Sequence, residues 1–220
     1  MKAMILAAGR GERLRPLTDS CPKPLLSIAG KSIIERMIVS LVENGFTELI
    51  INLSWKADLI RQTLGDGKQF GASLSYSDEG SEALETAGGI LKALPFFEDQ
   101  PFLVVNGDVY TDYPYATLLG QLVDHAHLVL VANPQHHSQG DFGLAGNQVV
   151  GQAEQMLTFS GIGVYHRRLF ERVLPGRQPL GPLLRASIAH GKVTGEYYPG
   201  AWMDIGTVQR YQAVNRYLEH

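Results

Sequence analysis

The chain has 220 residues, of which 45% are hydrophobic and 19% are charged, a composition typical of a globular protein with one well-formed core. A formal net charge of −3 argues against the broad basic surface that nucleic acid or an anionic membrane would require, so we expect neither as a partner. Cys21 is the single cysteine, which excludes an intramolecular disulfide and favours a reducing, cytoplasmic location. No apolar run approaches the roughly 20 residues of a membrane span.

Short apolar runs alternate with helix-like patterns through the first part of the chain. Strands are expected at residues 3–7, 49–53, 72–76, 102–105 and 128–132. Helices are expected between them, at residues 33–42, 57–64, 88–94 and 115–124. Such alternation predicts right-handed crossovers, so the expected fold class is α/β, with a single doubly wound, mostly parallel sheet covered by helices on both faces.

The pattern shortens in the last third of the chain. Strand-like pieces at residues 143–145, 148–150 and 158–164 predict a small antiparallel excursion from the main sheet. Helices are expected again at residues 167–173, 182–190 and 208–218. No internal repeat, low-complexity segment or long linker interrupts the sequence, so we expect one domain over residues 1–220.

A loop rich in glycine and cationic residues follows the first expected strand. Gly9 and Gly11 carry no side chain, so their backbone N–H groups can approach an anion closely. Positive charge is supplied by Arg10, Arg13, Arg15 and Lys23. The loop therefore predicts a site for a polyphosphate, with an ordinary solvated surface loop as the alternative.

Two common glycine motifs are excluded for this loop. Leu14 stands where a dinucleotide-binding loop needs a third small residue, and no Gly-Lys-Ser/Thr follows Gly9 as a Walker loop requires. Pro16, Pro22 and Pro24 remove N–H donors and favour extended backbone before them. We therefore expect an extended, stiff loop and not the start of a regular helix.

Two aspartates in apolar surroundings are candidate metal ligands. Asp108 follows the expected strand at residues 102–105, where ligands bind in open α/β sheets, and Asp204 lies in the segment Trp202–Thr207. Two carboxylates are enough for Mg²⁺, which completes its coordination with substrate phosphates and water. The alternatives are a turn at Asp108 and a helix cap at Asp204.

The histidines provide no obvious chemistry in this pattern. Magnesium avoids imidazole, so we expect a solvated role for the four in the central part of the chain, His125, His127, His136 and His137. No His-Asp pair or activated serine appears beside the glycine loop. Transfer of a phosphoryl-type group needs mainly positioning and charge neutralisation, which the loop and the aspartates supply.

These motifs together resemble the sugar-1-phosphate nucleotidylyltransferase family. The pattern Gly-x-Gly-x-Arg-Leu-x-Pro-x-Thr is matched at Gly9–Thr18, and Pro-Lys-Pro-Leu is matched at Pro22–Leu25. The resemblance implies a Rossmann-like nucleotidyltransferase fold, Mg²⁺ held by Asp108 and Asp204, and a nucleoside triphosphate and a sugar 1-phosphate as substrates. Arg13 is then expected to contact the leaving pyrophosphate, and Lys23 the phosphates that become linked.

The resemblance also implies a set of binding residues. Nucleotide contacts are expected at Ala8, Gly9, Gly11, Glu12, Arg13, Lys23, Glu79, Thr86 and Gly88. Sugar contacts are expected at Asn106, Asp141 and Glu154. Gln155 departs from a Glu-Lys pair that other branches use for the sugar, so sugar recognition is expected to differ from theirs.

Within the family, the chain resembles the branch that transfers UMP from UTP to N-acetylmuramate 1-phosphate in peptidoglycan recycling. The Gly-Glu-Arg variant at residues 11–13, Val105–Asp108 and the stretch at residues 158–162 carry this likeness. Because C-terminal segments that build tetramers in some relatives are missing, we expect a monomer. A mannose- or glucose-1-phosphate nucleotidylyltransferase using GTP or dTTP, and a non-catalytic nucleotide-sugar sensor, remain as alternatives.

Overall fold

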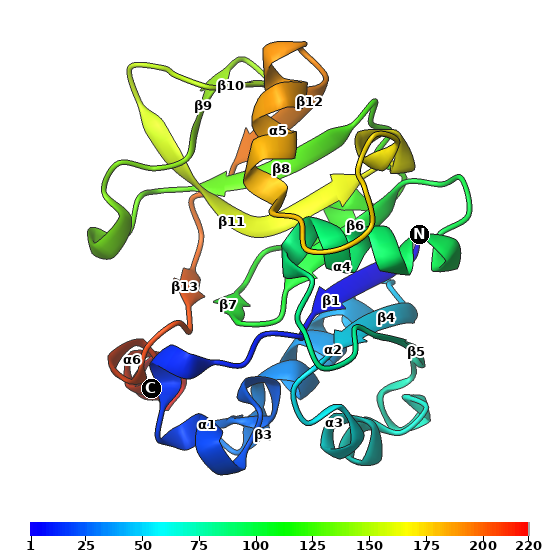
Figure 1. The fold of residues 1–220 in the computed structure, drawn as a ribbon. Helices are drawn as coiled ribbons and strands as arrows, with labels where there is room; N and C mark the ends of the chain where they lie inside the picture. Colours follow the sequence, from blue (N-terminus) through cyan, green and yellow to red (C-terminus); the bar gives the residue numbers. More distant parts are fainter. Residues whose placement is uncertain (220) are drawn as a thin grey trace.

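The computed structural model describes residues 1–219 and is built around a nine-stranded sheet (Figure 1). The first four strands of the sheet order are β5 (Ser73–Asp78), β4 (Glu48–Leu53), β1 (Ala3–Leu6) and β6 (Phe102–Asn106). These strands are parallel to one another. Their carboxyl ends therefore meet at one edge, as the alternating pattern predicts.

The rest of the sheet is mixed, and the expectation of a mostly parallel sheet is wrong here. The order continues with β11 (Met156–Tyr165), β8 (Ala126–Val131), β12 (Val193–Tyr197), β10 (Gln148–Val150) and β9 (Phe142–Ala145). Strand β11 is antiparallel to both β6 and β8, and of the eight neighbouring pairs along the sheet four are antiparallel. The pieces expected as a small excursion thus include a strand at the centre of the sheet.

Helices cover both faces of the sheet. They are α2 (Ile33–Glu43) and α3 (Ala57–Leu64) on one face and α4 (Glu85–Ala93) and α5 (Leu180–Ala189) on the other. Two further helices, α1 (Leu17–Ser20) and α6 (Val208–Leu218), pack in a separate cluster with Ile205. The side chain of Ser32 accepts from the amide of Glu35 at 3.3 Å, and the Glu35 carboxylate accepts from the amide of Ser32 at 2.9 Å. This capping box satisfies backbone donors that the first turn of α2 would leave free.

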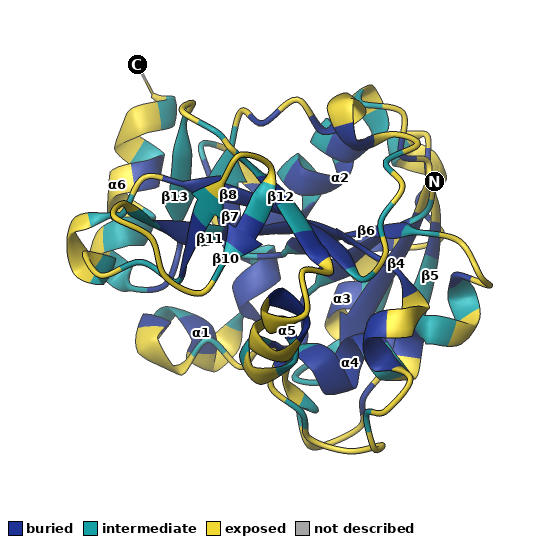
Figure 2. Cartoon of the chain, turned by 90° about the horizontal axis from the view of Figure 1, so that it is seen from above, coloured by how far each residue is buried: buried dark blue, intermediate teal, exposed yellow. Residues whose placement is uncertain are grey.

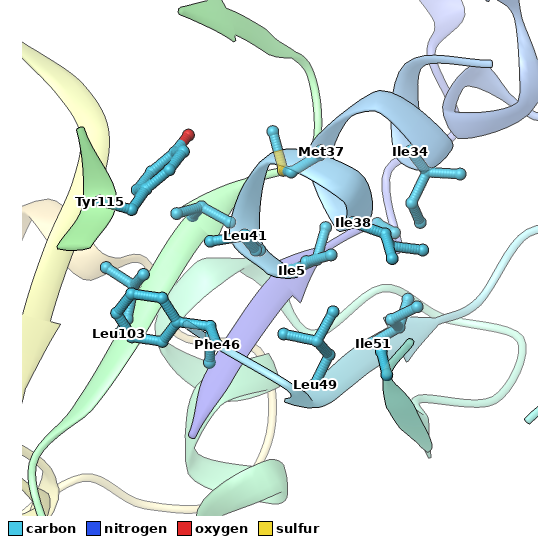
Figure 3. Packing of buried hydrophobic residues seen from close by; sticks show 14 of the residues in the cluster. Ile5, Ile34, Met37, Ile38, Leu41, Phe46, Leu49, Ile51, Leu103 and Tyr115 are labelled. Atoms are coloured by element: carbon cyan, nitrogen blue, oxygen red, sulfur yellow. The ribbon is translucent and has the colours of Figure 1, made fainter. Parts of the chain in front are cut away.

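Alternate residues of β1 belong to different hydrophobic clusters. Ile5 packs with Ile38 and Leu41 of α2 (Figure 3), whereas its neighbour Met4 belongs to the cluster that contains Ile90 of α4. Successive side chains of a strand point to opposite faces, and burying each one stabilises the fold by roughly 1.5–3 kcal/mol. Figure 2 shows the strands buried between helices that are exposed on their outer sides.

Two expected helices are only short 3-10 turns, at Tyr115–Leu118 and Arg167–Phe170. At the end of each turn a backbone amide donates a hydrogen bond to the carbonyl three residues earlier, from Leu119 to Ala116 and from Val173 to Phe170. Gly120 then adopts a left-handed φ of 77°, which ends the first of them. By contrast, α3 and α6 begin and end at the expected residues.

Two small ribbons supplement the main sheet. One pairs β2 (Ser27–Ile28) with β3 (Lys31–Ser32), and the other pairs β7 (Val109–Thr111) with β13 (Trp202–Asp204). Strands this short carry too few residues to show an alternating pattern, so none of the four was predicted. Over residues 1–219, no helix combines the length and the apolarity that crossing a bilayer would demand.

Candidate active site

The glycine loop starts beside Asp108 because β1 and β6 are adjacent and parallel. The amide of Gly107 donates to the carbonyl of Leu6 at 2.9 Å. A Cβ at position 107 would lie 2.4 Å from that carbonyl oxygen, so only glycine allows the two strand ends to approach this closely. The first residues of the loop and the first aspartate therefore share one edge of the sheet.

The loop is built from short helical turns, which corrects the expectation of an extended segment. It contains the 3-10 turn Glu12–Leu14, the α-helical turn α1 and the 3-10 turn Lys23–Leu25. Proline is tolerated in a first turn, where its missing N–H would have no partner. Leu14, the residue that excludes a dinucleotide motif, is 1% exposed and packs with Ile205.

Gly11 has a structural reason to be glycine. Its φ is 67°, and a Cβ there would lie 2.9 Å from Cγ2 of Thr18 and 3.0 Å from Cβ of Lys23. The carbonyl of Gly11 also accepts from the Thr18 hydroxyl at 2.9 Å. The loop thus folds back on itself and brings Lys23 under its glycines.

Lys23 forms an ion pair with Asp108. The ammonium Nζ donates to Oδ2 of Asp108, and the two side chains are 11% and 34% exposed. A lysine this deeply buried requires a charged partner. Asp108 thereby fixes the cation that was expected to contact the reacting phosphates.

Asp204 lies next to Asp108 because β13 pairs with β7. Asp204 is opposite Val109 in this ribbon, and the amide of Ile205 donates to the carbonyl of Asp108 at 2.7 Å. The two aspartates, distant in sequence, are therefore joined through backbone hydrogen bonds. The structure thus brings the two aspartates together, and their binding of a shared metal stays a prediction.

Asp204 is held by a residue that sequence reasoning missed. Nη1 of Arg210 lies 2.7 Å from Oδ2 and 3.0 Å from Oδ1 of Asp204, and Nε2 of His136 lies 3.1 Å from Oδ1. A Cβ at Gly206 would lie 2.2 Å from Nη2 of Arg210, so the glycine makes room for the guanidinium. A signal existed in the sequence, since Arg210 is in the first turn of the helix that directly follows Asp204.

The residues fit Mg²⁺. Asp108 and Asp204 provide hard oxygen ligands, and no cluster of three His, Cys, Asp or Glu side chains able to hold a metal occurs within residues 1–219. Magnesium commonly uses only one or two carboxylates, together with substrate phosphates and water. Each carboxylate already has a cationic neighbour, Lys23 or Arg210, which offsets the charge of the pair.

Three adjoining cavities meet at Asn106. The loop cavity, of 220 Å³, is lined by Gly9, Lys23, Thr86, Asp108 and neighbouring residues. The carboxylate cavity, of 420 Å³, is lined by Asp108, Asp204, Arg210, Arg13, Trp202 and both His136 and His137. The α5 cavity, of 240 Å³, is lined by Asp141, Phe142, Arg185 and residues near Thr86. Asn106 belongs to all three linings.

Not all loop residues face these cavities. Ala8 is 7% exposed, and Glu12 is exposed but belongs to none of the three linings. Arg13 lines the carboxylate cavity, whereas Gly9 and Lys23 line the loop cavity. Of the four loop cations, Arg13 and Lys23 therefore border the cavities that contain the aspartates, whereas Arg10 packs over Trp55 and Arg15 pairs with Asp19.

Glu79 is buried beneath the loop. Its Oε1 accepts from Nδ2 of Asn52 at 2.6 Å, and its Oε2 accepts from the amide of Leu84 at 2.7 Å. Oδ1 of Asn52 in turn accepts from the amide of Ala7 at 2.7 Å. This network ties β1 and β4 to the segment that enters α4. Asn52 was missed, although it is the one polar residue in the apolar run Leu49–Leu53.

The start of α4 packs against a distant segment. The amides of Ala87 and Gly88 donate to the carbonyl of Gln178 at 3.0 and 3.1 Å. A Cβ at Gly88 would lie 2.2 Å from the carbonyl oxygen of Gly176. Gly88 therefore holds this segment in place, while Thr86 faces both the loop cavity and the α5 cavity.

Only two of the three expected sugar-binding residues reach a cavity. Asp141 lines the α5 cavity, but its Oδ2 accepts from the amide of Phe159 at 2.9 Å and its Oδ1 lies 3.1 Å from Nε2 of His137. Asn106 lines all three cavities. Glu154 is exposed and is part of no cavity lining described here.

The expectation that the histidines are merely solvated is wrong. His136 and His137 line the carboxylate cavity, and His127 is only 7% exposed. The turn Gln135–His137 brings the first two to the site, while His127 lies in the buried strand β8. A local sequence pattern does not reveal such long-range placement.

Comparisons with known proteins agree with this geometry. The family model described as nucleotidyl transferase matches residues 2–160. The chain is 47% identical to the N-acetylmuramate alpha-1-phosphate uridylyltransferase of Neisseria meningitidis serogroup B, covering 96% of this chain and 95% of the relative. It is 30% identical to the enzyme of that name in Caulobacter vibrioides, over 94% of this chain and 92% of the relative.

Solved structures show the same fold. A putative glucose-1-phosphate thymidylyltransferase from Bacillus anthracis superposes with a TM-score of 0.88 at 21% identity, covering 99% of this chain and 94% of the other. HddC from Yersinia pseudotuberculosis, complexed with GMP-PN, superposes with a TM-score of 0.81 at 23% identity, covering 99% of both chains. With its fold, its glycine loop and a family match over most of its length, the chain belongs to the nucleotidyl transferase family.

Proposed function

We propose that this chain transfers UMP from UTP to N-acetylmuramate 1-phosphate, forming UDP-N-acetylmuramate and pyrophosphate, with Mg²⁺ as cofactor. The observation that carries the proposal is the convergence of Asp108 and Asp204 between a cation-rich loop and the cavities around Asn106. The choice of uridylyl group and acceptor is supported by the two relatives named for that reaction, at 47% and 30% identity.

The reaction is an in-line substitution at the α-phosphorus. A phosphate oxygen of the acceptor forms a new P–O bond as the bond to the β-phosphate oxygen breaks, and the electron pair leaves with pyrophosphate. A phosphate monoester has a second pKa of about 6, so it is ionised at neutral pH and needs no general base. This explains why the site requires cations and carboxylates rather than an activated nucleophile.

The cations have separate tasks in this reaction. Arg13, in the carboxylate cavity, stabilises charge on the leaving pyrophosphate. Lys23, paired with Asp108 and bordering the loop cavity, neutralises the phosphates that become linked. Asp108 and Asp204 would hold Mg²⁺, which would supply further charge neutralisation at the phosphate oxygens.

The two substrates occupy different cavities. The nucleoside occupies the loop cavity, with Gly9 on one side and Thr86 on the other. The other expected nucleotide contacts, Ala8, Gly11, Glu12, Glu79 and Gly88, lie outside the lining of this cavity. The acceptor sugar occupies the α5 cavity, against Asn106 and Asp141. In-line attack requires the acceptor phosphate to reach the α-phosphorus from the side opposite the leaving pyrophosphate. We further propose that the protein acts as a cytoplasmic monomer.

The test is a grid of substrates with Mg²⁺, scored by pyrophosphate release. UTP, GTP and dTTP are each combined with N-acetylmuramate, mannose and glucose 1-phosphates. We expect UTP with N-acetylmuramate 1-phosphate to give the highest kcat/KM. A preference for GTP with mannose 1-phosphate would contradict the proposal, and binding without turnover would indicate a sensor. Light scattering tests the monomer, which a stable tetramer would contradict.

A further inference from the structure

We propose that Arg185 recognises the carboxylate of the acceptor sugar and so selects N-acetylmuramate 1-phosphate over its analogue without the lactyl group. This inference rests on the proposed function and adds a residue that determines specificity. It starts from the α5 cavity, which adjoins the reaction centre through Asn106 and Thr86.

Arg185 lies on α5 and is exposed along the wall of this cavity. Within residues 1–219 its guanidinium forms no hydrogen bond and no ion pair with another side chain. Two of the other cations that border the reaction centre are paired, Lys23 with Asp108 and Arg210 with Asp204, while Arg13 lines the carboxylate cavity and not the α5 cavity. Arg185 is therefore available to an anionic ligand.

The guanidinium is held in place without being neutralised. Its Cζ atom lies 5.6 Å from the centroid of the Phe142 ring, within the range of a cation–π contact. Phe142 is itself 3% exposed and fixed by pairing with Leu157. One turn earlier on α5, a Cβ at Gly181 would lie 3.3 Å from Nη1 of Arg185, so the glycine leaves space for the guanidinium. Arg185 is thus positioned with its charge free.

The acidic residues of the cavity already have partners. Both carboxylate oxygens of Asp141 are engaged, by the Phe159 amide and by His137. Glu85 pairs with Arg177 through an Oε1–Nε distance of 3.1 Å. An anion that enters the cavity therefore meets one uncompensated positive charge, that of Arg185.

The chemistry of the acceptor complements this charge. N-acetylmuramate differs from N-acetylglucosamine by a lactyl ether on O3, which ends in a carboxylate. A guanidinium binds a carboxylate with two parallel N–H···O bonds, a geometry that adds specificity as well as affinity. A sugar that lacks this group leaves the guanidinium solvated and gains nothing from it.

The experiment compares Arg185→Met with the unchanged protein at saturating UTP. The variant keeps the length of the side chain and removes its charge. We expect KM for N-acetylmuramate 1-phosphate to rise roughly 10- to 100-fold, the size expected for a hydrogen-bonded charge pair. KM for N-acetylglucosamine 1-phosphate and KM for UTP are expected to change less than about twofold. Arg185→Lys, which keeps the charge, should recover part of the loss.

Calorimetry provides a second measurement that does not depend on turnover. Arg185→Met should weaken binding of UDP-N-acetylmuramate and leave binding of UDP unchanged. Arg172→Met is the matched control, because Arg172 is exposed and lies outside the three cavities. It should behave as the unchanged protein.

The outcomes separate the inference from the proposed function. If Arg185→Met raises KM equally for both sugar 1-phosphates, or changes neither KM, the carboxylate assignment is wrong while the proposed function stands. The same holds if it weakens UDP as much as UDP-N-acetylmuramate. If the unchanged protein forms no UDP-N-acetylmuramate at all, the proposed function fails and the inference falls with it.

Discussion

Arg210 places Nη1 within 3.0 Å of both carboxylate oxygens of Asp204. Both residues line the carboxylate cavity, where the proposed reaction requires positive charge. Removing the guanidinium would leave a partly buried carboxylate with only His136 beside it. Arg210 therefore positions Asp204, the second of the two proposed metal ligands.

Gly206→Ala tests this arrangement without changing a charge. The new methyl group would lie 2.2 Å from Nη2 of Arg210 and displace the guanidinium. We expect kcat to fall by at least about tenfold, the effect of a 1.4 kcal/mol loss in the transition state, with a small change in Tm. Gly151→Ala is the control, since nothing lies within 4 Å of a Cβ at position 151. Equal activity of the two variants would contradict the role of Arg210.

Asp108→Asn should abolish pyrophosphate release that depends on Mg²⁺. The amide retains the shape of the side chain but provides one weak oxygen ligand and no charge, so metal and Lys23 both lose their partner. Circular dichroism should show an intact fold, because the backbone bond from Ile205 to Asp108 is unaffected. Turnover near that of the unchanged protein would disprove the metal assignment.

Lys23→Met should lower turnover by about two orders of magnitude or more, since a preorganised charge at a developing anion is worth roughly 3–4 kcal/mol. The methionine fills much of the buried volume left by the lysine stem, which is 11% exposed. Lys68→Met, at an 87% exposed side chain, is the control. A fall in Tm without a fall in kcat would show that Lys23 is only a structural cation.

Asn52→Ala should destabilise the fold. The substitution leaves the amide of Ala7 and one oxygen of Glu79 without their partners, at a cost of about 1–3 kcal/mol for each buried group. Urea unfolding measures the change. Asn147→Ala, at an exposed loop position, should alter the free energy of unfolding by less than about 0.5 kcal/mol. A similar change in the free energy of unfolding for both variants would show that this hydrogen-bond network does not stabilise the fold.

His127 should make the fold less stable as the pH falls. Burial lowers the pKa of His127, and it outweighs the nearby Glu196 carboxylate at 3.6 Å, which acts in the opposite direction. Below its unfolded pKa of about 6.5, the unfolded chain binds a proton that the folded chain resists, so stability is lost as pH decreases through this range.

His127→Gln should therefore show a shallower decline in the free energy of unfolding between pH 7 and pH 5. Urea titrations at several pH values measure the slope. His190→Gln, at an exposed histidine, is the control and should keep the original slope. If His127→Gln also keeps that slope, burial of His127 has no influence on stability in this range.

The sequence predicted those parts of the molecule that local patterns determine. Periodic apolar residues located α3 and α6, and the placement of Asp108 followed from its position after a strand. The insertion of β11 between β6 and β8 could not be predicted, because strand-like residues do not reveal which partners a strand will choose.

The same limit applies to the site. Lys23 and Asp108 were both expected there, but their direct pairing depends on how the loop folds back at Gly11. Arg210 lies in the helix that directly follows Asp204 and could have been inferred from that position, whereas His136 reaches Asp204 from a turn far away in the sequence that no local pattern indicated. Arg185 lies one helical turn from Gly181, a relation that gains meaning only once α5 is packed on Phe142.

The β7–β13 ribbon also affects when the protein can begin to work during its synthesis. The strands β1, β4, β5 and β6, the glycine loop and Asp108 all leave the ribosome well before Asp204 and Arg210. Leu14 of the glycine loop packs with Ile205, so the loop cannot complete its packing until the segment that carries Asp204 has been translated. On the proposed function, pyrophosphate release should therefore appear only after Asp204 and Arg210 have both been translated.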